Sequence, residues 1–344
     1  MSNKKPMFDF VIGNPPYQEP RTNTSDAPIY HHFMEAAYRC ANVVETITPG
    51  RFLFNAGKTP KEWNEKMLAD EHLKVVMYEQ DSAAIFPTTD IKGGIAIILR
   101  NKDHKFGAID VFAAYEEMRT VYKKIKQDLE NNGNLSDIMV LQNKYNTTTL
   151  FAEHPELPQK LSNDGKERRL VSSCFEKNPC FTNNKVADDD ICVLGILSLA
   201  RTYKYLPKKY IEDNGNLYKY KVLVPNSNGS GAVGEVMSTP LIGTPLIGYT
   251  QSFIGIGAFD TLQEAEAALK YVKTKFCRLT LGLLKATQSN SPDKWQYVPL
   301  QDFTAHSDVD WSQSVANIDQ QLYTKYGLSQ NEIDFIESHV KEME

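Results

Sequence analysis

The chain has 344 residues, of which 41% are hydrophobic and 24% are charged, and its formal net charge is −5 at pH 7. This length allows one large hydrophobic core or two of medium size, and the composition is that of a globular protein. The negative net charge excludes nonspecific polyanion binding over the whole surface, so a nucleic-acid site would have to be a local basic patch.

The cysteines, the histidines and the acidic runs give no sign of a metal site. The five cysteines are scattered without a C-x-x-C pair, so neither zinc nor a disulfide framework is indicated. His31–His32 and Asp188–Asp190 lack further ligands at suitable spacing. No apolar run is long enough to cross a bilayer, and the polar start Met1–Lys5 is not a signal peptide. We expect a cytoplasmic protein with no membrane partner and no bound metal.

The first part of the chain alternates predicted strands with predicted helices. Apolar runs predict strands, and apolar residues at helical spacing predict helices between them. The strands are expected at Phe8–Ile12, Val44–Thr48, Leu73–Tyr78 and Gly94–Leu99, and the helices at Pro28–Val43, after Thr59-Pro60, and at Ala114–Asn132. Such alternation implies a parallel sheet covered by helices, which is an α/β fold.

The second part has a different composition. Residues 144–190 are rich in Asn, Thr, Pro and charge, and residues 219–256 alternate β-branched runs with turn residues, which predicts antiparallel strands. Residues 260–287 are predicted to form one long helix. The tail, residues 309–344, predicts a helical pair in which Gly327 ends the first helix and Ser329-x-x-Glu332 caps the second.

The predicted strand at the start of the chain ends in Gly13 and continues directly into Asn14-Pro15-Pro16-Tyr17. This arrangement resembles the catalytic loop of amino-methyltransferases, which act on an amine conjugated to a ring. Such an amine is a poor nucleophile, because its lone pair is delocalised. The Asn14 side-chain oxygen and the Pro15 carbonyl could accept hydrogen bonds from such an amine and free the lone pair, while the prolines fix the loop. Tyr17 could stack on the ring. The alternative interpretation is a proline-rich turn after a strand.

The N-P-P-Y loop resembles the catalytic loop of amino-methyltransferases, and further segments narrow the resemblance. Together they are similar to the C-terminal portion of γ-class adenine-specific DNA methyltransferases, above all the type IIG polypeptides of restriction–modification systems. These segments are Ile29–Glu35, Ile47–Phe54, Ile85–Gly94 and Asp310–Glu337.

The resemblance implies a partial Rossmann-like methyltransferase sheet that lacks its first strands. A mixed α+β target-recognition domain and the C-terminal helical pair would follow. The implied domains are residues 1–135, the C-terminal half of the catalytic domain; residues 136–308, the DNA-binding domain; and residues 309–344, the helical pair.

The resemblance also implies the activity. A methyl group would pass from S-adenosylmethionine to the exocyclic amine of an adenine flipped out of double-stranded DNA. Asn14, Pro15 and Tyr17 would hold the base, and Pro16 would shape the loop. Two alternatives remain open: a non-catalytic DNA-recognition module, and a methyltransferase acting on protein glutamine or on RNA.

The chain departs from the family in two ways. The strand Ile95–Arg100 carries no aromatic residue, whereas many relatives have one there that closes the second face of the base. Only thirteen residues precede Asn14, although relatives place the cofactor site before this loop. We therefore expect that the chain either is truncated or needs a partner chain for most of the S-adenosylmethionine site, and that Phe8–Ile12 is an edge strand. A cofactor site permuted to Phe253–Asp260, which contains G-x-G, is the less favoured possibility.

Two basic clusters are candidate DNA contacts, because lysine and arginine bind phosphates. The first cluster is Lys270, Lys273, Lys275 and Arg278, and the second is Lys204, Lys208 and Lys209. The alternative interpretation of each is an ordinary solvated face. No nuclease motif stands out, so a nuclease would be a separate partner.

Overall fold

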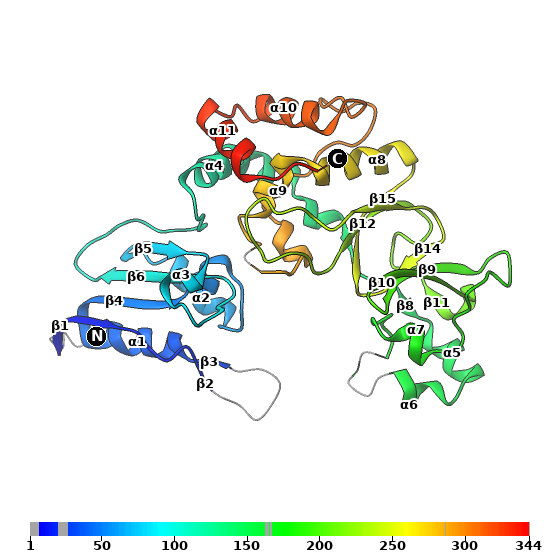
Figure 1. Ribbon diagram of the computed structural model, residues 1–344, viewed down its shortest axis with the longest axis horizontal. Helices are drawn as coiled ribbons and strands as arrows, with labels where there is room; N and C mark the ends of the chain where they lie inside the picture. The colour runs from blue at the N-terminus through cyan, green and yellow to red at the C-terminus, as the bar shows by residue number, and fades with distance from the viewer. Residues whose placement is uncertain (1–6, 20–26, 162–164, 166, 286, 344) are drawn as a thin grey trace. The chain divides into compact units, whose positions relative to one another are not determined.

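The structure is a computed structural model that describes residues 7–19, 27–161, 165, 167–285 and 287–343 (Figure 1). The chain forms two compact units. The first unit comprises residues 1–121 with 230–233 and 282–287, and the second comprises residues 122–229, 234–281 and 288–344.

The division between the units falls within helix α4 (Glu116–Asn132) and not at the predicted residue 135. The later part of α4 belongs to the second unit because its polar side chains bind there. Lys124 Nζ lies 2.5 Å from a carboxylate oxygen of Glu332, and the Tyr326 hydroxyl donates to Asp128.

The first unit is built on a sheet with the strand order β1-β4-β6-β5. Strands β1 and β4 are parallel, but β6 is antiparallel to both of its neighbours. The sheet is therefore mixed, and the prediction of a parallel sheet was wrong for β6. The strands are β1 (Phe8–Gly13), β4 (Ala41–Pro49), β5 (Leu73–Glu79) and β6 (Ile95–Asn101).

Helices cover one face of this sheet and enclose the core of the first unit. Alternate residues of the central strands, such as Val44 and Ile98, are buried on that face. Met34 of α1 and Met67 of α2 pack in the same core region. The helices are α1 (Tyr30–Cys40), a 3-10 helix (Gly50–Phe54), α2 (Lys61–Leu68) and α3 (Ser82–Ile85).

Strand β1 is an edge strand of the sheet among the described residues, as predicted, because β4 is its one neighbour there. Phe8, Phe10 and Ile12 alternate along it and so point to one face, where they are 53%, 68% and 79% exposed. A strand edge with unpaired backbone groups beside exposed apolar side chains favours association with another chain.

The second unit contains antiparallel strands, as the composition of residues 219–256 predicts. Strand β12 pairs with β13 and β15, and a second sheet has the order β10-β9-β14, in which β14 is parallel to β9. These strands are β9 (Ile191–Leu197), β10 (Ala200–Leu206), β12 (Tyr220–Pro225), β13 (Leu241–Gly243), β14 (Ile247–Tyr249) and β15 (Phe253–Phe259).

Shorter elements complete the two units. The short strands are β2 (Gln18–Glu19) and β3 (Ala27–Pro28) in the first unit, and β7 (Met139–Val140), β8 (Lys144–Tyr145) and β11 (Ile211–Glu212) in the second. The short helices of the second unit are α5 (Thr147–Glu153), α6 (Leu157–Leu161) and α7 (Cys174–Lys177), together with 3-10 turns at Leu135–Ile138, Lys208–Tyr210 and Pro292–Trp295.

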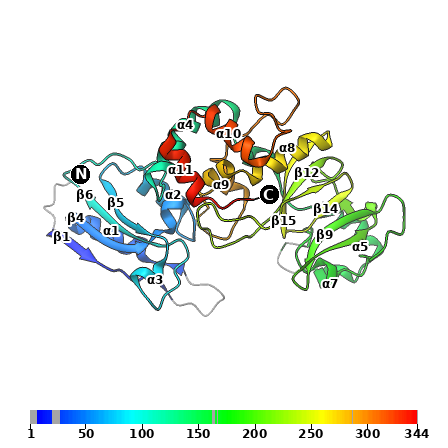
Figure 2. The same ribbon diagram turned by 45° about the horizontal axis from the view of Figure 1, so that its top comes forward.

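The predicted long helix at residues 260–287 is interrupted. Helix α8 (Leu262–Lys273) packs on β12 and β15 (Figure 2), and α9 (Lys275–Leu281) begins after Thr274 in an extended conformation. The Asp319 carboxylate accepts hydrogen bonds from the backbone N–H groups of Lys275 and Phe276, both at 2.9 Å. This carboxylate caps a new helix start, so the break is favoured by a residue far away in sequence.

The tail forms the predicted helical pair, α10 (Val315–Lys325) and α11 (Gln330–His339). Gly327 has a φ of +59° between them, and Ser329 and Glu332 form the predicted capping box. Helix α10 packs on α8 and α9, and α11 packs on α9. The pair therefore belongs to the compact second unit and not to a separate domain.

We predict that the exposed face of β1 drives self-association of the isolated chain. Replacing Phe10 and Ile12 together by Lys should give a monomer, because charge on an edge strand opposes pairing. Sedimentation velocity over a range of concentrations measures this. The matched control replaces Val186 and Leu199, which are 79% and 99% exposed in the second unit, by Lys. Equal association of wild type and both variants would contradict the prediction.

Candidate functional site

The N-P-P-Y loop leaves the end of β1 and is held in place by backbone hydrogen bonds. The Tyr17 carbonyl accepts a hydrogen bond from Ile29 N at 3.1 Å, and Gln18 then pairs with Pro28. The half-buried Tyr17 ring packs against the core of the first unit. Its hydroxyl is buried and has no hydrogen-bond partner among the described residues, and burial raises the pKa of Tyr17, so the hydroxyl stays neutral. A buried hydroxyl without a partner is unusual and is able to bind a ligand.

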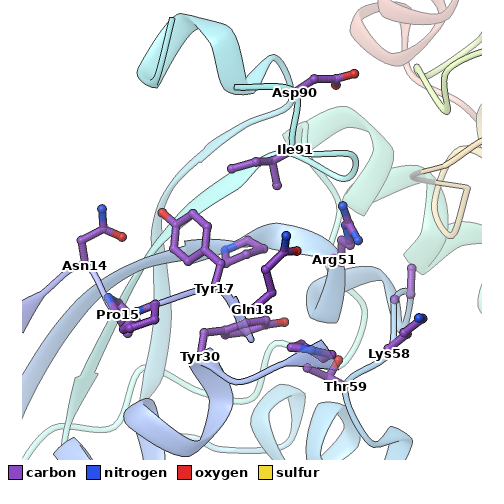
Figure 3. A pocket seen from close by; sticks show the side chains of 15 residues that line it. Asn14, Pro15, Tyr17, Gln18, Tyr30, Arg51, Lys58, Thr59, Asp90 and Ile91 are labelled. Atoms are coloured by element: carbon purple, nitrogen blue, oxygen red, sulfur yellow. The ribbon is translucent and has the colours of Figure 1, made fainter. Parts of the chain in front are cut away.

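A pocket of about 760 Å³ opens beside this loop, within the size range of small-ligand sites (Figure 3). Asn14 and Pro15 lie at one end of the pocket, and Arg51 and Lys58 at the other. The remaining lining residues are Pro16, Tyr17, Gln18, Pro28, Tyr30, Pro49, Ala56, Gly57, Thr59, Asp90 and Ile91. The structure therefore brings the four predicted catalytic residues to one pocket.

Three of the four sequence segments that carried the family resemblance contribute residues to this pocket. Tyr30 comes from the segment at residues 29–35, Arg51 from residues 47–54, and Asp90 and Ile91 from residues 85–94. No side chain of these segments was singled out from the sequence as a site residue. The sequence could have pointed to Tyr30, Arg51, Asp90 and Ile91 only through their position in segments that resemble the family.

The pocket combines aromatic and charged walls. Tyr30 is buried, and burial raises the pKa of its hydroxyl to about 12, so it is a neutral wall. Arg51 and Lys58 place positive charge on one side, and Asp90 places negative charge near the opening. A planar base could lie against the tyrosines, and its negatively charged phosphates would be attracted to the cations.

Ser82 holds the loop that carries Asp90 and Ile91 through two hydrogen bonds of its hydroxyl. The Ser82 hydroxyl donates to Thr89 O at 3.1 Å and accepts from Ile91 N at 2.8 Å. At the end of the loop, Gly94 N donates to Ile91 O at 3.1 Å. The loop therefore presents Ile91 to the pocket in a defined position.

The first basic cluster was predicted to contact DNA phosphates. Three of its cations, Lys270, Lys275 and Arg278, instead bind groups of the protein. Lys270 Nζ donates to the carbonyls of Trp311, Ser312 and Gln313 at 2.7, 3.2 and 2.9 Å, so its charge stabilises that loop. Lys275 is paired with Glu337.

Arg278 is only 3% exposed and donates to the carbonyls of Lys273, Gly234, Glu235 and Lys341. Burial lowers its pKa. Such a guanidinium is not available to a phosphate. The predicted phosphate contact is therefore corrected for Lys270, Lys275 and Arg278, and it remains a prediction for Lys273.

The second basic cluster lies on and after β10. Lys204 Nζ is 5.9 Å from the centre of the Phe175 ring, and Lys208 Nζ is 5.6 Å from that of Tyr218. Lys209 is exposed and pairs with Glu153 at 2.6 Å. An exposed ion pair contributes little stability and can exchange partners. A phosphate contact by these three lysines remains a prediction.

The less favoured cofactor site at residues 253–260 has no space for a nucleotide at its glycines. Both glycines of the G-x-G belong to strand β15. A Cβ on Gly255 would collide with the Tyr249 hydroxyl and with Asn216, and a Cβ on Gly257 would collide with the Phe259 ring. Protein side chains therefore fill the space beside these glycines that the adenosyl and methionine parts of the donor would need to approach the backbone closely. The residues present do not fit the adenosyl donor.

Within the described ranges, no group of three or more His, Cys, Asp or Glu side chains is placed to hold a metal ion. Among the same residues, no helix has the length and apolar character needed to span a bilayer.

Comparison with known proteins gives one family match. Residues 1–86 match the family described as Eco57I restriction-modification methylase, so the N-P-P-Y loop and most of the pocket lie in a segment similar to these methylases. No curated protein matches the chain. The crystal structure of the type IIG restriction endonuclease BpuSI is similar over 92% of this chain and 49% of that one, at 11% identity and a TM-score of 0.34. The chain thus spans about half the length of BpuSI.

We predict that Gly94→Ala strongly destabilises the first unit. Gly94 has a φ of +70°, and a Cβ there would collide with the backbone of Glu79 and lie 2.9 Å from Gln80 Cα. The expected loss is about 3 kcal/mol of unfolding free energy, measured by urea denaturation. Gly107→Ala is the control, since Gly107 has a φ of +92° with open space around it and should lose only about 1 kcal/mol. Equal losses would show that the close approach at Gly94 is unimportant.

We predict that Arg278→Ala lowers the free energy of unfolding by about 3 kcal/mol, because one buried and three partly buried carbonyls lose their donor. Urea denaturation measures this. Lys208→Ala is the control, because Lys208 is exposed and its loss should change stability by at most about 0.5 kcal/mol. An unchanged stability together with weakened DNA binding would restore Arg278 as a phosphate contact.

Proposed function

We propose that the chain is the catalytic-loop and DNA-recognition part of an adenine-specific DNA methyltransferase of a restriction–modification system. The observation that carries the proposal is the pocket in which Asn14, Pro15 and Tyr17 meet, within the residues that match a restriction–modification methylase. The substrate would be an adenine flipped out of double-stranded DNA, because a base inside the duplex cannot enter a pocket.

Each loop residue has a role that follows from its chemistry. The Asn14 side-chain oxygen and the Pro15 carbonyl would accept hydrogen bonds from the adenine amine and make its lone pair available. Tyr17 packs against the core of the first unit, and its ring would stack on one face of the adenine. Pro16 restricts the backbone, so the acceptors need little reorganisation when the base arrives.

The methyl donor would be S-adenosylmethionine, whose sulfonium makes the methyl group electrophilic. The glycines at residues 255 and 257 are packed by this chain's own side chains, so they do not supply the donor site. We propose that a partner chain supplies most of that site and meets the first unit at the free edge of β1. A nuclease would be a further partner.

DNA would bind the second unit through a local basic patch. Lys204, Lys208, Lys209 and Lys273 are the proposed phosphate contacts, and the exposed ion pair of Lys209 with Glu153 could be exchanged for one with a phosphate. The net charge of −5 requires such a patch to be local. Cytoplasmic placement follows from the proposed substrate.

A second candidate function is a DNA-recognition module without catalysis. The exposed apolar edge of β1 favours it, because a chain without its partner would hold the catalytic loop but no donor. Methylation of protein glutamine or of RNA is a third outcome that the following experiment distinguishes.

We predict that Asn14→Ala abolishes methyl transfer. The chain is expressed alone and with the adjoining reading frame in a host without adenine methylation, and the DNA is analysed for N6-methyladenine by mass spectrometry. The wild type with its partner should methylate DNA, and Asn14→Ala should lose at least about 100-fold in rate, as expected for loss of a group that acts on the reacting centre. DNA binding should stay within about twofold, because Asn14 contacts no phosphate in this mechanism.

The matched control is Asn131→Ala, an exposed asparagine of α4 outside the pocket, which should behave as wild type. Equal methylation by the wild type and Asn14→Ala would refute the assignment of the loop. Methylated glutamine or RNA without methylated DNA would change the substrate class.

A further inference from the structure

The hairpin of β9 and β10 ends in a two-residue turn with an unusual backbone conformation (Figure 1). The two strands pair without interruption up to Leu197 and Ala200, so Ser198 and Leu199 alone form the turn. Their φ angles are +49° and +66°. Two-residue hairpin turns with positive φ at both positions usually contain Asn and Gly, because a bulky side chain such as leucine crowds its own backbone in this region.

Leu199 makes no contact in the protein that offsets this strain. Its side chain is 99% exposed, so it contributes no buried apolar surface to the fold. A single exposed leucine is ordinary on a protein surface, but here the exposure is combined with an unfavourable backbone conformation. Strain that no packing offsets is typical of functional positions, and it directs the search for a role of Leu199 to a partner molecule.

The turn stands on a rigid support. Strand β9 is the central strand of its sheet, and seven residue pairs join it to β10. Close to the turn, Arg201 Nη2 donates to Thr239 O at 2.6 Å, and the guanidinium carbon lies 5.6 Å from the centre of the Phe253 ring. These contacts fix the hairpin to the rest of the second unit, so Leu199 is held out into solvent in a defined position.

The charge of the hairpin indicates the chemistry of the partner. Residues 191–211 contain no acidic residue but four basic ones, which are Arg201, Lys204, Lys208 and Lys209. Lys209 is paired with Glu153 from outside this segment. Positive charge beside an exposed apolar tip complements a DNA duplex, in which phosphates flank stacked bases. The major groove of DNA also has the width of a two-stranded β-ribbon.

We propose that the hairpin of β9 and β10 enters the major groove of DNA and that Leu199 inserts between two base pairs as an apolar wedge. The inference rests on the proposed function, because it requires the second unit to bind DNA. An apolar side chain that inserts in this way partly unstacks the bases. The bases then bury the leucine, which supplies the contact that it lacks in the free protein, while Arg201 and Lys204 attract the neighbouring phosphates.

The test compares binding of the full chain to two DNA duplexes that differ at one position. One duplex is fully paired, and the other has a single mismatched base pair, where stacking is weaker and insertion costs less. The ratio of the two dissociation constants, measured by fluorescence anisotropy, separates the wedge from the phosphate contacts that both duplexes share. The wild type should prefer the mismatched duplex about tenfold, and Leu199→Ala should lose most of this preference, because burial of a leucine side chain accounts for about that factor.

A second readout reports the unstacking itself. 2-Aminopurine placed next to the mismatch becomes more fluorescent when it loses its stacking neighbours. Saturating amounts of the wild type should raise this fluorescence, and saturating amounts of Leu199→Ala should leave it near the value of the free duplex.

Two further variants and a matched control distinguish a wedge from a structural residue. Leu199→Gly should lose the preference and yet raise the thermal unfolding temperature, because glycine adopts positive φ without strain. A structural residue would not combine weaker binding with a more stable fold. Leu199→Phe should keep the preference, since phenylalanine also acts as a wedge. The control Val186→Ala shortens another exposed aliphatic side chain of the second unit and should change neither quantity.

The outcomes separate this inference from the proposed function. If the wild type binds neither duplex, recognition of DNA fails and the wedge fails with it. If the wild type binds both and Leu199→Ala leaves the ratio unchanged, the wedge is wrong and the proposed function stands. If Leu199→Ala weakens binding to both duplexes equally, Leu199 is a groove contact and the wedge is overturned. Replacing thymine by uracil then shows whether that contact is to thymine methyl groups.

Discussion

The close packing of the Gly93-Gly94 turn is the constraint on which the candidate site depends. Gly93 rests on the Arg51 stem, and Gly94 approaches the backbone between Glu79 and Gln80. Only glycine allows this approach at positive φ without strain. Because the turn is held there, β6 starts at a fixed position, and the preceding loop returns Ile91 over the N-P-P-Y loop. Two segments about seventy residues apart in sequence thus face one pocket.

Local sequence patterns correctly predicted the features that depend on residues close together along the chain. The apolar run before Asn14 forms a strand, and the capping box at Ser329 and Glu332 is present. The edge position of β1 is also present, but it was expected from the family resemblance and not from a local pattern. The direction of β6 was missed, because an apolar run does not encode strand direction. The break at Thr274 was missed because the carboxylate that caps α9 belongs to Asp319.

For the basic clusters too, local sequence patterns did not reveal the contacts with distant residues that decide what each side chain does. A row of lysines in sequence suggests a charged surface, but its acceptors here are backbone carbonyls that no sequence pattern reveals. Arg278 is buried among such carbonyls, and Lys270 holds the loop before α10. Positive charge in the second unit therefore stabilises long-range loop packing as well as serving as a candidate surface for DNA. The pocket residues Tyr30, Arg51 and Ile91 were hidden for a related reason, since each is ordinary in its own segment.

Among the described residues β1 is an edge strand, and any pairing along that edge would act on the N-P-P-Y loop that follows it. Gly13 ends the strand, and Asn14 follows without an intervening residue. A strand that paired along this edge would hold the backbone immediately before the loop in a second set of hydrogen bonds, and it would cover Phe10 and Ile12 at the same time. Complex formation would then order the amine acceptors in the same event that buries the apolar face. The order of the N-P-P-Y loop would then depend on the concentration of the chain that supplies the pairing strand.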